Sequence, residues 1–213
     1  MYTILFIVII TIALYIIAKR NQAKTSKVNF KIFPTQFVVF DLETTGLNPE
    51  SSEIIEIGAI KVDLSNSANS LDQLQVKSFE VLIKPTKSVP KKITEITGIT
   101  QEVLDSSGGL LSDELPDFLE FIGDLPLVSY NADFDMAFLY QAVAKVFPDE
   151  QLKNKVSCAL KMARKAWPGL KSYKLSELSK IMKLDADNEH RALGDTKRTL
   201  VIYVHAATEL NYA

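Results

Sequence analysis

Apolar residues in the first half of the chain fall into short runs that predict strands. Residues 37–40, 53–62 and 79–83 are rich in β-branched and aromatic side chains, which favour strands. The polar, serine- and asparagine-rich stretch 64–75 between the last two runs predicts a hairpin loop. A short run at 125–130 predicts a further strand.

Apolar positions in the second half recur at helical spacing, as Leu115, Leu119 and Ile122 illustrate. Ser112 and Asp113 are available to cap the start of that helix. The predicted helices cover residues 112–122, 133–147, 158–167, 175–183 and 191–209. Strands come first, strand and helix then alternate, and helices accumulate at the end. This order predicts one α/β domain with a mixed sheet.

Residues 2–18 (YTILFIVIITIALYIIA) carry no charged side chain. As a helix they would span about 25 Å, the short end for a bilayer crossing. A cleaved signal peptide fits poorly because no basic stretch precedes the run and Ile16 occupies a position that needs a small residue. A buried core helix would rarely be apolar on every face. We therefore expect a transmembrane anchor at 1–20.

Five basic residues and no acidic ones follow this run within residues 19–40. The positive-inside rule then predicts a single-pass membrane protein with the rest of the chain facing the cytoplasm. The expected organisation is an anchor at 1–20, a polar basic linker at 21–34 and a globular domain at 35–213.

Composition narrows the possible chemistry. Apolar residues make up 47% of the chain, enough for a substantial core, and the single cysteine, Cys158, permits neither an intramolecular disulfide nor a cysteine-based zinc site. Beyond residue 31 the chain has 19 basic against 26 acidic residues, a net charge of −7. Such a domain has no general attraction for nucleic acid, so local basic patches or bound cations would have to supply it.

Asp41 and Glu43 follow the first predicted strand, and the strand period of two projects both from the same face. Adjacent carboxylates repel each other unless a cation lies between them or one is protonated. Hard oxygen ligands of this kind suit Mg²⁺ or Mn²⁺. An Asp-x-Glu triplet alone is also compatible with two solvated side chains at a strand end.

Two later segments contain further aspartates and a histidine that could act together with this pair. Tyr130 to Asp135 (YNADFD) lies at a strand-to-helix junction, where an Asp can also serve as a helix N-terminal charge. His190 to Asp195 (HRALGD) opens the last long helix. A lone histidine is usually an ordinary surface or core residue, and His205 is given no role.

VFDLETTGL, SYNADFD and HRALGD, in this order, resemble the three motifs of the DEDDh branch of the DEDD exonuclease superfamily. That branch includes the epsilon proofreading subunit of bacterial DNA polymerase III. The resemblance runs from Thr35 to Leu210 and includes 54–59 and 96–100. It implies a ribonuclease H-like α/β fold with a five-stranded mixed sheet flanked by helices, preceded here by the predicted transmembrane helix.

The resemblance also implies residue roles. The implied metal ligands are Asp41, Glu43, Asp135 and Asp195, with His190 as the general base. It selects Asp135 over its neighbour Asp133, and Tyr130 departs from the histidine that members commonly have there. Thr44, Leu47 and Phe134 are expected to line the pocket for the terminal nucleotide. Two Mg²⁺ ions about 4 Å apart, with Mn²⁺ as a substitute, would clamp the scissile phosphate.

The implied activity is 3′→5′ hydrolysis of single-stranded ends, DNA rather than RNA, with release of nucleoside 5′-monophosphates. The alternatives are an RNA exonuclease or oligoribonuclease-like enzyme, and a catalytically silent binding module on the same fold. Because 18 residues follow Asp195, we expect a stand-alone enzyme with no stable polymerase partner. Residues 153–183 hold nine basic residues and one acid, Glu177, which predicts either a backbone-tracking patch or solvated helix faces.

Overall fold

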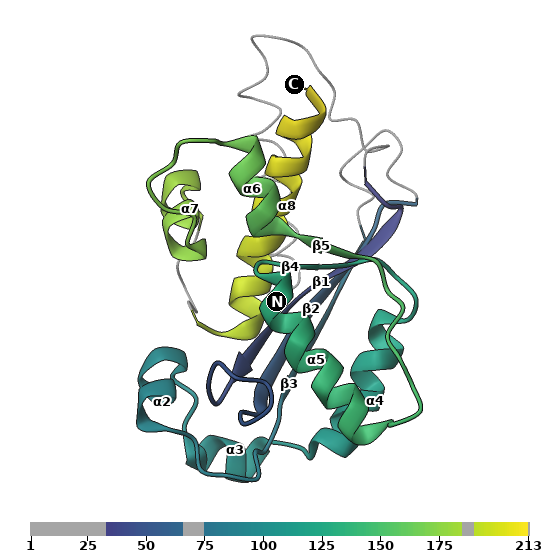
Figure 1. Ribbon diagram of the computed structural model, residues 1–213, viewed down its shortest axis with the longest axis vertical. Helices are drawn as coiled ribbons and strands as arrows, with labels where there is room; N and C mark the ends of the chain where they lie inside the picture. Colours follow the sequence, from purple (N-terminus) through teal and green to yellow (C-terminus); the bar gives the residue numbers. More distant parts are fainter. Residues whose placement is uncertain (1–32, 66–74, 185–189, 213) are drawn as a thin grey trace.

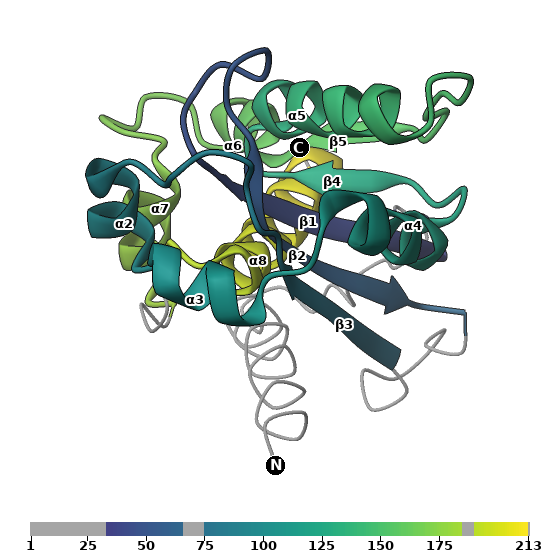
Figure 2. The ribbon, with the colours of Figure 1, turned by 90° about the horizontal axis from the view of Figure 1, so that it is seen from below.

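In the computed structural model, which describes residues 33–65, 75–184 and 190–212, the strands form one five-stranded mixed sheet (Figure 1). The strands are β1 (Gln36–Thr44), β2 (Ile54–Asp63), β3 (Gln75–Leu82), β4 (Leu127–Ser129) and β5 (Val156–Cys158). Their order is β3-β2-β1-β4-β5, with β3 and β5 at the two edges (Figure 2). β1 pairs antiparallel with β2 and parallel with β4, which confirms the predicted α/β fold.

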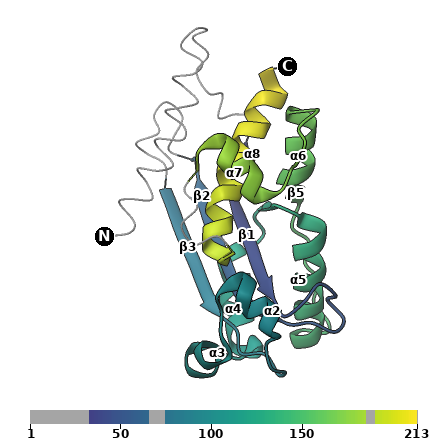
Figure 3. The same cartoon turned by 90° about the vertical axis from the view of Figure 1, so that its left-hand side faces the viewer.

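Seven helices follow or interrupt the strands in the described part of the chain. They are α2 (Lys91–Thr97), α3 (Gln101–Ser107), α4 (Leu111–Ile122), α5 (Ala132–Val146), α6 (Ala159–Ala166), α7 (Leu175–Met182) and α8 (Ala192–Tyr212). Figures 1 and 3 show α6, α7 and α8 grouped at one end of the molecule and α2 and α3 at the other.

The alternation of side chains along β1 divides the core into two layers. Phe37 and Val39 pack in a cluster with residues of α6, α7 and α8. Val38, Phe40 and Leu42 point to the other face and pack against α4 and α5. The next residues on the α8 side of β1 are the two acids predicted at the site, so the apolar face of this strand continues directly into a carboxylate pair.

Three elements, α2, α3 and β5, were not predicted from the sequence pattern. The two helices have seven residues each, too few to show a full helical stripe. Leu104 of α3 and Ile99, which lies between the two helices, pack with Ile55 in a small separate cluster. β5 has three residues, too few to show strand alternation. The predicted cap of α4 is wrong, because the helix begins at Leu111 and its N-cap, Leu110, makes no side-chain cap bond.

The membrane prediction needs correction. No helix within 33–65, 75–184 or 190–212 is both long and apolar enough to cross a bilayer. Residues 2–18, on which the prediction rested, lie outside the described residues, as does most of the predicted 64–75 loop. The assignment as a single-pass membrane protein facing the cytoplasm is therefore overturned, because the described structure contains no spanning helix.

Candidate active site

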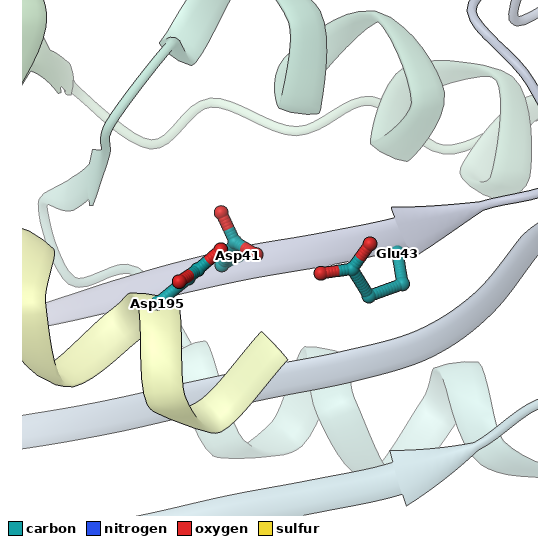
Figure 4. Close-up of side chains that lie close together, drawn as sticks. All are labelled: Asp41, Glu43 and Asp195. Carbon is teal, nitrogen blue, oxygen red and sulfur yellow. The ribbon is translucent and has the colours of Figure 1, made fainter. Parts of the chain in front are cut away.

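Three of the four predicted metal ligands come together. Asp41 and Glu43 project from the end of β1, and Asp195 reaches them from the first turn of α8 (Figure 4). One carboxylate oxygen of each lies within 4.8 Å of the others. Residues separated by 152 positions in sequence thus form one cluster because α8 lies across the end of β1.

Gly58 allows this close approach of α8. It is paired with Asp41 in the β1–β2 ladder, so the two positions share a face of the sheet. A Cβ atom at Gly58 would lie 2.3 Å from the backbone nitrogen of Leu193 and 2.4 Å from the carbonyl carbon of Ala192. The Thr196 hydroxyl donates to the Gly58 carbonyl at 3.0 Å. The first turn of α8 therefore rests directly on β2, which places Asp195 beside Asp41.

Glu56 of β2 also stabilises the position of the first turn of α8. It is paired with Glu43 and is fully buried. Its carboxylate accepts hydrogen bonds from Arg191 Nε and Nη2, at 2.9 and 2.5 Å, and from the backbone N–H of Ala192 at 2.8 Å. The family resemblance includes residues 54–59 but implies no role for Glu56. A charged residue inside an apolar strand was the available signal, because buried charges are almost always paired.

Asp135 lies apart from the three-carboxylate group but interacts with it electrostatically. It is buried at the start of α5 and accepts a hydrogen bond from the Ser129 hydroxyl. Asp133, the neighbouring candidate, is exposed and pairs with Lys161 at 2.8 Å. Of these two acids, only Asp135 is buried and interacts electrostatically with Asp41.

The cluster is electrostatically strained without a cation. Burial, followed by the charges of Asp135 and Asp195, raises the pKa of Asp41 well above its usual range. Burial and then the charge of Asp195 raise the pKa of Glu43 from 4.5 to about 8. Burial raises the pKa of Asp135 to about 7, although the Ser129 hydroxyl opposes this. These carboxylates together need positive charge to ionise at neutral pH.

Nearby arginines supply only part of that charge. The guanidinium of Arg198, buried one turn along α8, pairs with Asp195. Arg191 lowers the pKa of Glu43, but its own hydrogen bonds go to Glu56. The donor set that remains, several oxygen ligands in a partly buried site, is the kind that binds Mg²⁺ or Mn²⁺.

The remaining predicted site residues are not part of this cluster. His190 is exposed just before α8, with a left-handed φ of 59°, and it is not among the metal-ligating groups within 4.8 Å. The buried Thr44 donates its hydroxyl to the Gly46 carbonyl at 2.6 Å. Leu47 is 84% exposed, and Phe134 packs on Phe138 with ring centroids 5.0 Å apart.

Comparisons with known proteins give the family. The model of the family described as Exonuclease, RNase_T, matches residues 38–203. The DNA polymerase III epsilon subunit of Aquifex aeolicus is 32% identical over 191 residues, which cover 90% of each chain. A PolC-type DNA polymerase III of Clostridium perfringens is 37% identical over 170 residues, 80% of this chain, but the match spans only 11% of that polymerase.

A solved structure shares the fold. The zinc-bound complex of E. coli ExoI with single-stranded DNA has a TM-score of 0.69 and 21% identity, over 84% of this chain and 43% of that one. The family match covers most of the chain and includes the carboxylates of β1 and α8. The chain therefore belongs to the RNase_T family of exonucleases, within the DEDDh exonuclease superfamily.

Proposed function

We propose that the chain is a metal-dependent 3′→5′ exonuclease that releases nucleoside 5′-monophosphates from DNA ends. The observation that carries the proposal is the cluster of Asp41, Glu43 and Asp195, three carboxylates within 4.8 Å at the end of a buried strand. Such a cluster is unfavourable unless cations neutralise it. Its place within a matched exonuclease family supports phosphodiester hydrolysis as the chemistry.

The donor set fits two divalent ions, Mg²⁺ in the first instance. Asp41, Glu43 and Asp195 would hold the ions, and Asp135 would support the second one from its position at the start of α5. Bound there, the metals would activate a water and stabilise the leaving 3′ oxygen. These acids create a demand for positive charge, because burial first and repulsion between neighbouring carboxylates second raise the pKa values of Asp41 and Glu43.

His190 is proposed as the general base that accepts the proton of the attacking water. Histidine is the side chain that most often accepts a proton in general base catalysis. Two observations support the role. The residue precedes Arg191, which Glu56 fastens beside the carboxylates, and its exposed ring is accessible to solvent and substrate.

The terminal nucleotide is proposed to lie against the turn after β1 and the first turn of α5. Leu47 is exposed there, and an exposed leucine next to a charged site can pack on a base or sugar without recognising its identity. Thr44 and Phe134 would complete the pocket. The single-stranded DNA in the ExoI complex and the polymerase names of the sequence relatives favour DNA over RNA as the substrate.

A polarity assay tests this function. A single strand labelled at its 5′ end should give, with Mg²⁺, a ladder that shortens from the 3′ end, and the released product should be the 5′-monophosphate. A circular single strand of the same composition is the matched control and should stay intact. RNA and duplex versions establish substrate preference. Cleavage of the circle, or a ladder that shortens from the 5′ end, would exclude the proposed activity.

A further inference from the structure

A groove outside the carboxylate cluster runs along the β5 edge of the sheet. It has a volume of about 570 Å³, and its lining residues come from α5, β5 and α6. Its lining includes Met136 and Tyr140 of α5, Val156 of β5, and Lys161, Met162 and Lys165 of α6. None of these residues is used by the proposed hydrolysis.

The groove begins beside the proposed active site. Asp133 and Met136, which line it, flank Asp135 in the first turns of α5. Both β4 and β5 run parallel to β1, so α5 and α6 start at the same end of the strands as Asp41 and Glu43. From Ala132 to Tyr140 the wall formed by α5 extends about 12 Å away from that end of the strands.

The charge of this region is opposite to that of the domain. Residues 151–176 contain seven basic residues and no acid, in a chain whose residues beyond 31 carry −7. Lys161 and Lys165 are exposed and lie one turn apart on α6, so both face the groove. The one acid in the lining, Asp133, is balanced by its ion pair with Lys161. Exposed pairs of this kind contribute little stability, so a phosphate can replace Asp133 as the partner of Lys161.

The opposite wall is apolar and partly open. Tyr140 is 48% exposed and Val156 is 39% exposed, and Met136 and Met162 lie in the same groove. An aromatic ring beside paired cations is the arrangement that single-strand binding proteins use, in which bases stack and lysines hold phosphates. A neutral peptide would use the apolar wall but leave the lysines without a counter-charge.

We propose that this groove binds the strand immediately 5′ to the scissile bond, with its phosphates at Lys161 and Lys165 and a base on Tyr140. The inference rests on the proposed exonuclease function. It accounts for how a domain with a net negative charge holds a polyanion whose reacting end lies among carboxylates. The site adds affinity for longer strands and plays no part in the hydrolysis itself.

Substrate length separates the groove from the active site. A dinucleotide can fill the active site alone, whereas an oligomer of about ten nucleotides falls in the usual range for single-strand sites. Lys161→Ala/Lys165→Ala should raise KM for the oligomer and leave kcat and the dinucleotide reaction unaffected. Loss of two phosphate contacts should reduce the slope of log affinity against log salt by about 1.4. The defect should therefore be about sevenfold larger at 50 mM than at 200 mM salt.

Three further variants extend the test. Asp133→Asn frees Lys161, so it should lower KM for the oligomer, the opposite sign to Lys165→Ala. Lys77→Ala removes an exposed lysine from β3, at the other edge of the sheet. It is the matched control and should leave kcat and KM unchanged for both substrates. Tyr140→Ala should weaken oligomer binding about fivefold or more through lost stacking.

Equal effects of the lysine double variant on dinucleotide and oligomer, or no effect on either, would overturn the groove assignment. A protein or peptide partner for this surface would give the second outcome. Failure of the proposed function looks different, because the unmodified chain would then hydrolyse neither substrate with Mg²⁺. Oligomer binding to Asp41→Asn, measured by fluorescence anisotropy, still tests the groove in that event, since the same lysine variants must reduce it.

Discussion

The carboxylate of Glu56 and the guanidinium of Arg191 form a two-pronged ion pair that fastens the start of α8 to β2. The partners differ in environment, because Glu56 is fully buried and the Arg191 side chain is 39% exposed. Arg191 can turn to water when its partner is lost, whereas Glu56 cannot. The pair should therefore respond asymmetrically to substitution.

Arg191→Ala should destabilise the fold by about 3–5 kcal/mol, because it leaves a buried carboxylate without its counter-charge. Glu56→Gln should cost less, since the amide still accepts the Ala192 N–H and the freed guanidinium is solvated. Urea unfolding at neutral pH measures both. Equal costs for the two variants would contradict this account.

Gly58→Ala should destabilise the protein by about 1–3 kcal/mol, because the added methyl group meets the backbone of Ala192 and Leu193. The helix can relieve the clash only by moving away from β2, which would also carry Asp195 away from Asp41. Gly46→Ala provides the comparison, since its new Cβ would meet the Ser52 side chain, which can rotate. Denaturant midpoints of the two variants should differ, and a Gly58→Ala protein as stable as its parent would be inconsistent with the close helix contact.

The metal-free protein should lose stability as pH rises from about 4.5 to about 8. Folding raises the pKa of Glu43 to about 8 and that of Asp135 to about 7, so the folded state holds protons that the unfolded state has released. Thermal unfolding in EDTA should show this decline. Mg²⁺ at a hundred times its pH 8 dissociation constant should restore about 2.7 kcal/mol at pH 8, and the same concentration should restore less at lower pH, where protons compete for the carboxylates.

Removing one charge from the cluster tests the same electrostatics. Glu43→Gln should stabilise the metal-free protein near pH 8 and abolish much of the stabilisation by Mg²⁺. Asp63→Asn is the control, because Asp63 lies at the far end of β2 and hydrogen bonds with Ser65 and Gln36 lower its pKa. A stability of the metal-free protein that rises with pH would contradict the strained cluster.

Strand geometry made part of this site predictable from sequence. Phe37 to Glu43 alternate between two faces, so the common face of Asp41 and Glu43 followed from the period of a strand. The ion pair that holds α8 beside the cluster could not be predicted in this way. Glu56 and Arg191 are 135 positions apart, and their contact depends on the tertiary packing of α8. Asp133 and Asp135 share a helical turn, and only their burial in the fold separates them.

Asp135→Asn should reduce nucleotide release by at least about a hundredfold, because it removes a charge beside the metal ligands while preserving size. The Ser129 hydroxyl still has an acceptor in the amide, so the fold should be retained, and the metal-free protein should become more stable above pH 7 because the raised pKa of Asp135 no longer opposes folding there. Asp149→Asn, in the exposed segment after α5, is the matched control and should retain full activity. Steady-state kinetics on a single-stranded oligomer distinguish the two, and equal activity would remove Asp135 from the site.

The most direct test of the central claim is the Mg²⁺-dependent rate of nucleotide release by Asp41→Asn relative to the unmodified chain. Asp41 interacts electrostatically with Glu43, Asp135 and Asp195, and its loss should abolish metal-dependent hydrolysis. The metal-free protein should become more stable, because folding then no longer buries a carboxyl whose ionisation is opposed by burial and by its neighbours. A folded Asp41→Asn protein that releases 5′-monophosphates at the rate of the unmodified chain would contradict the assignment of this cluster as the active site.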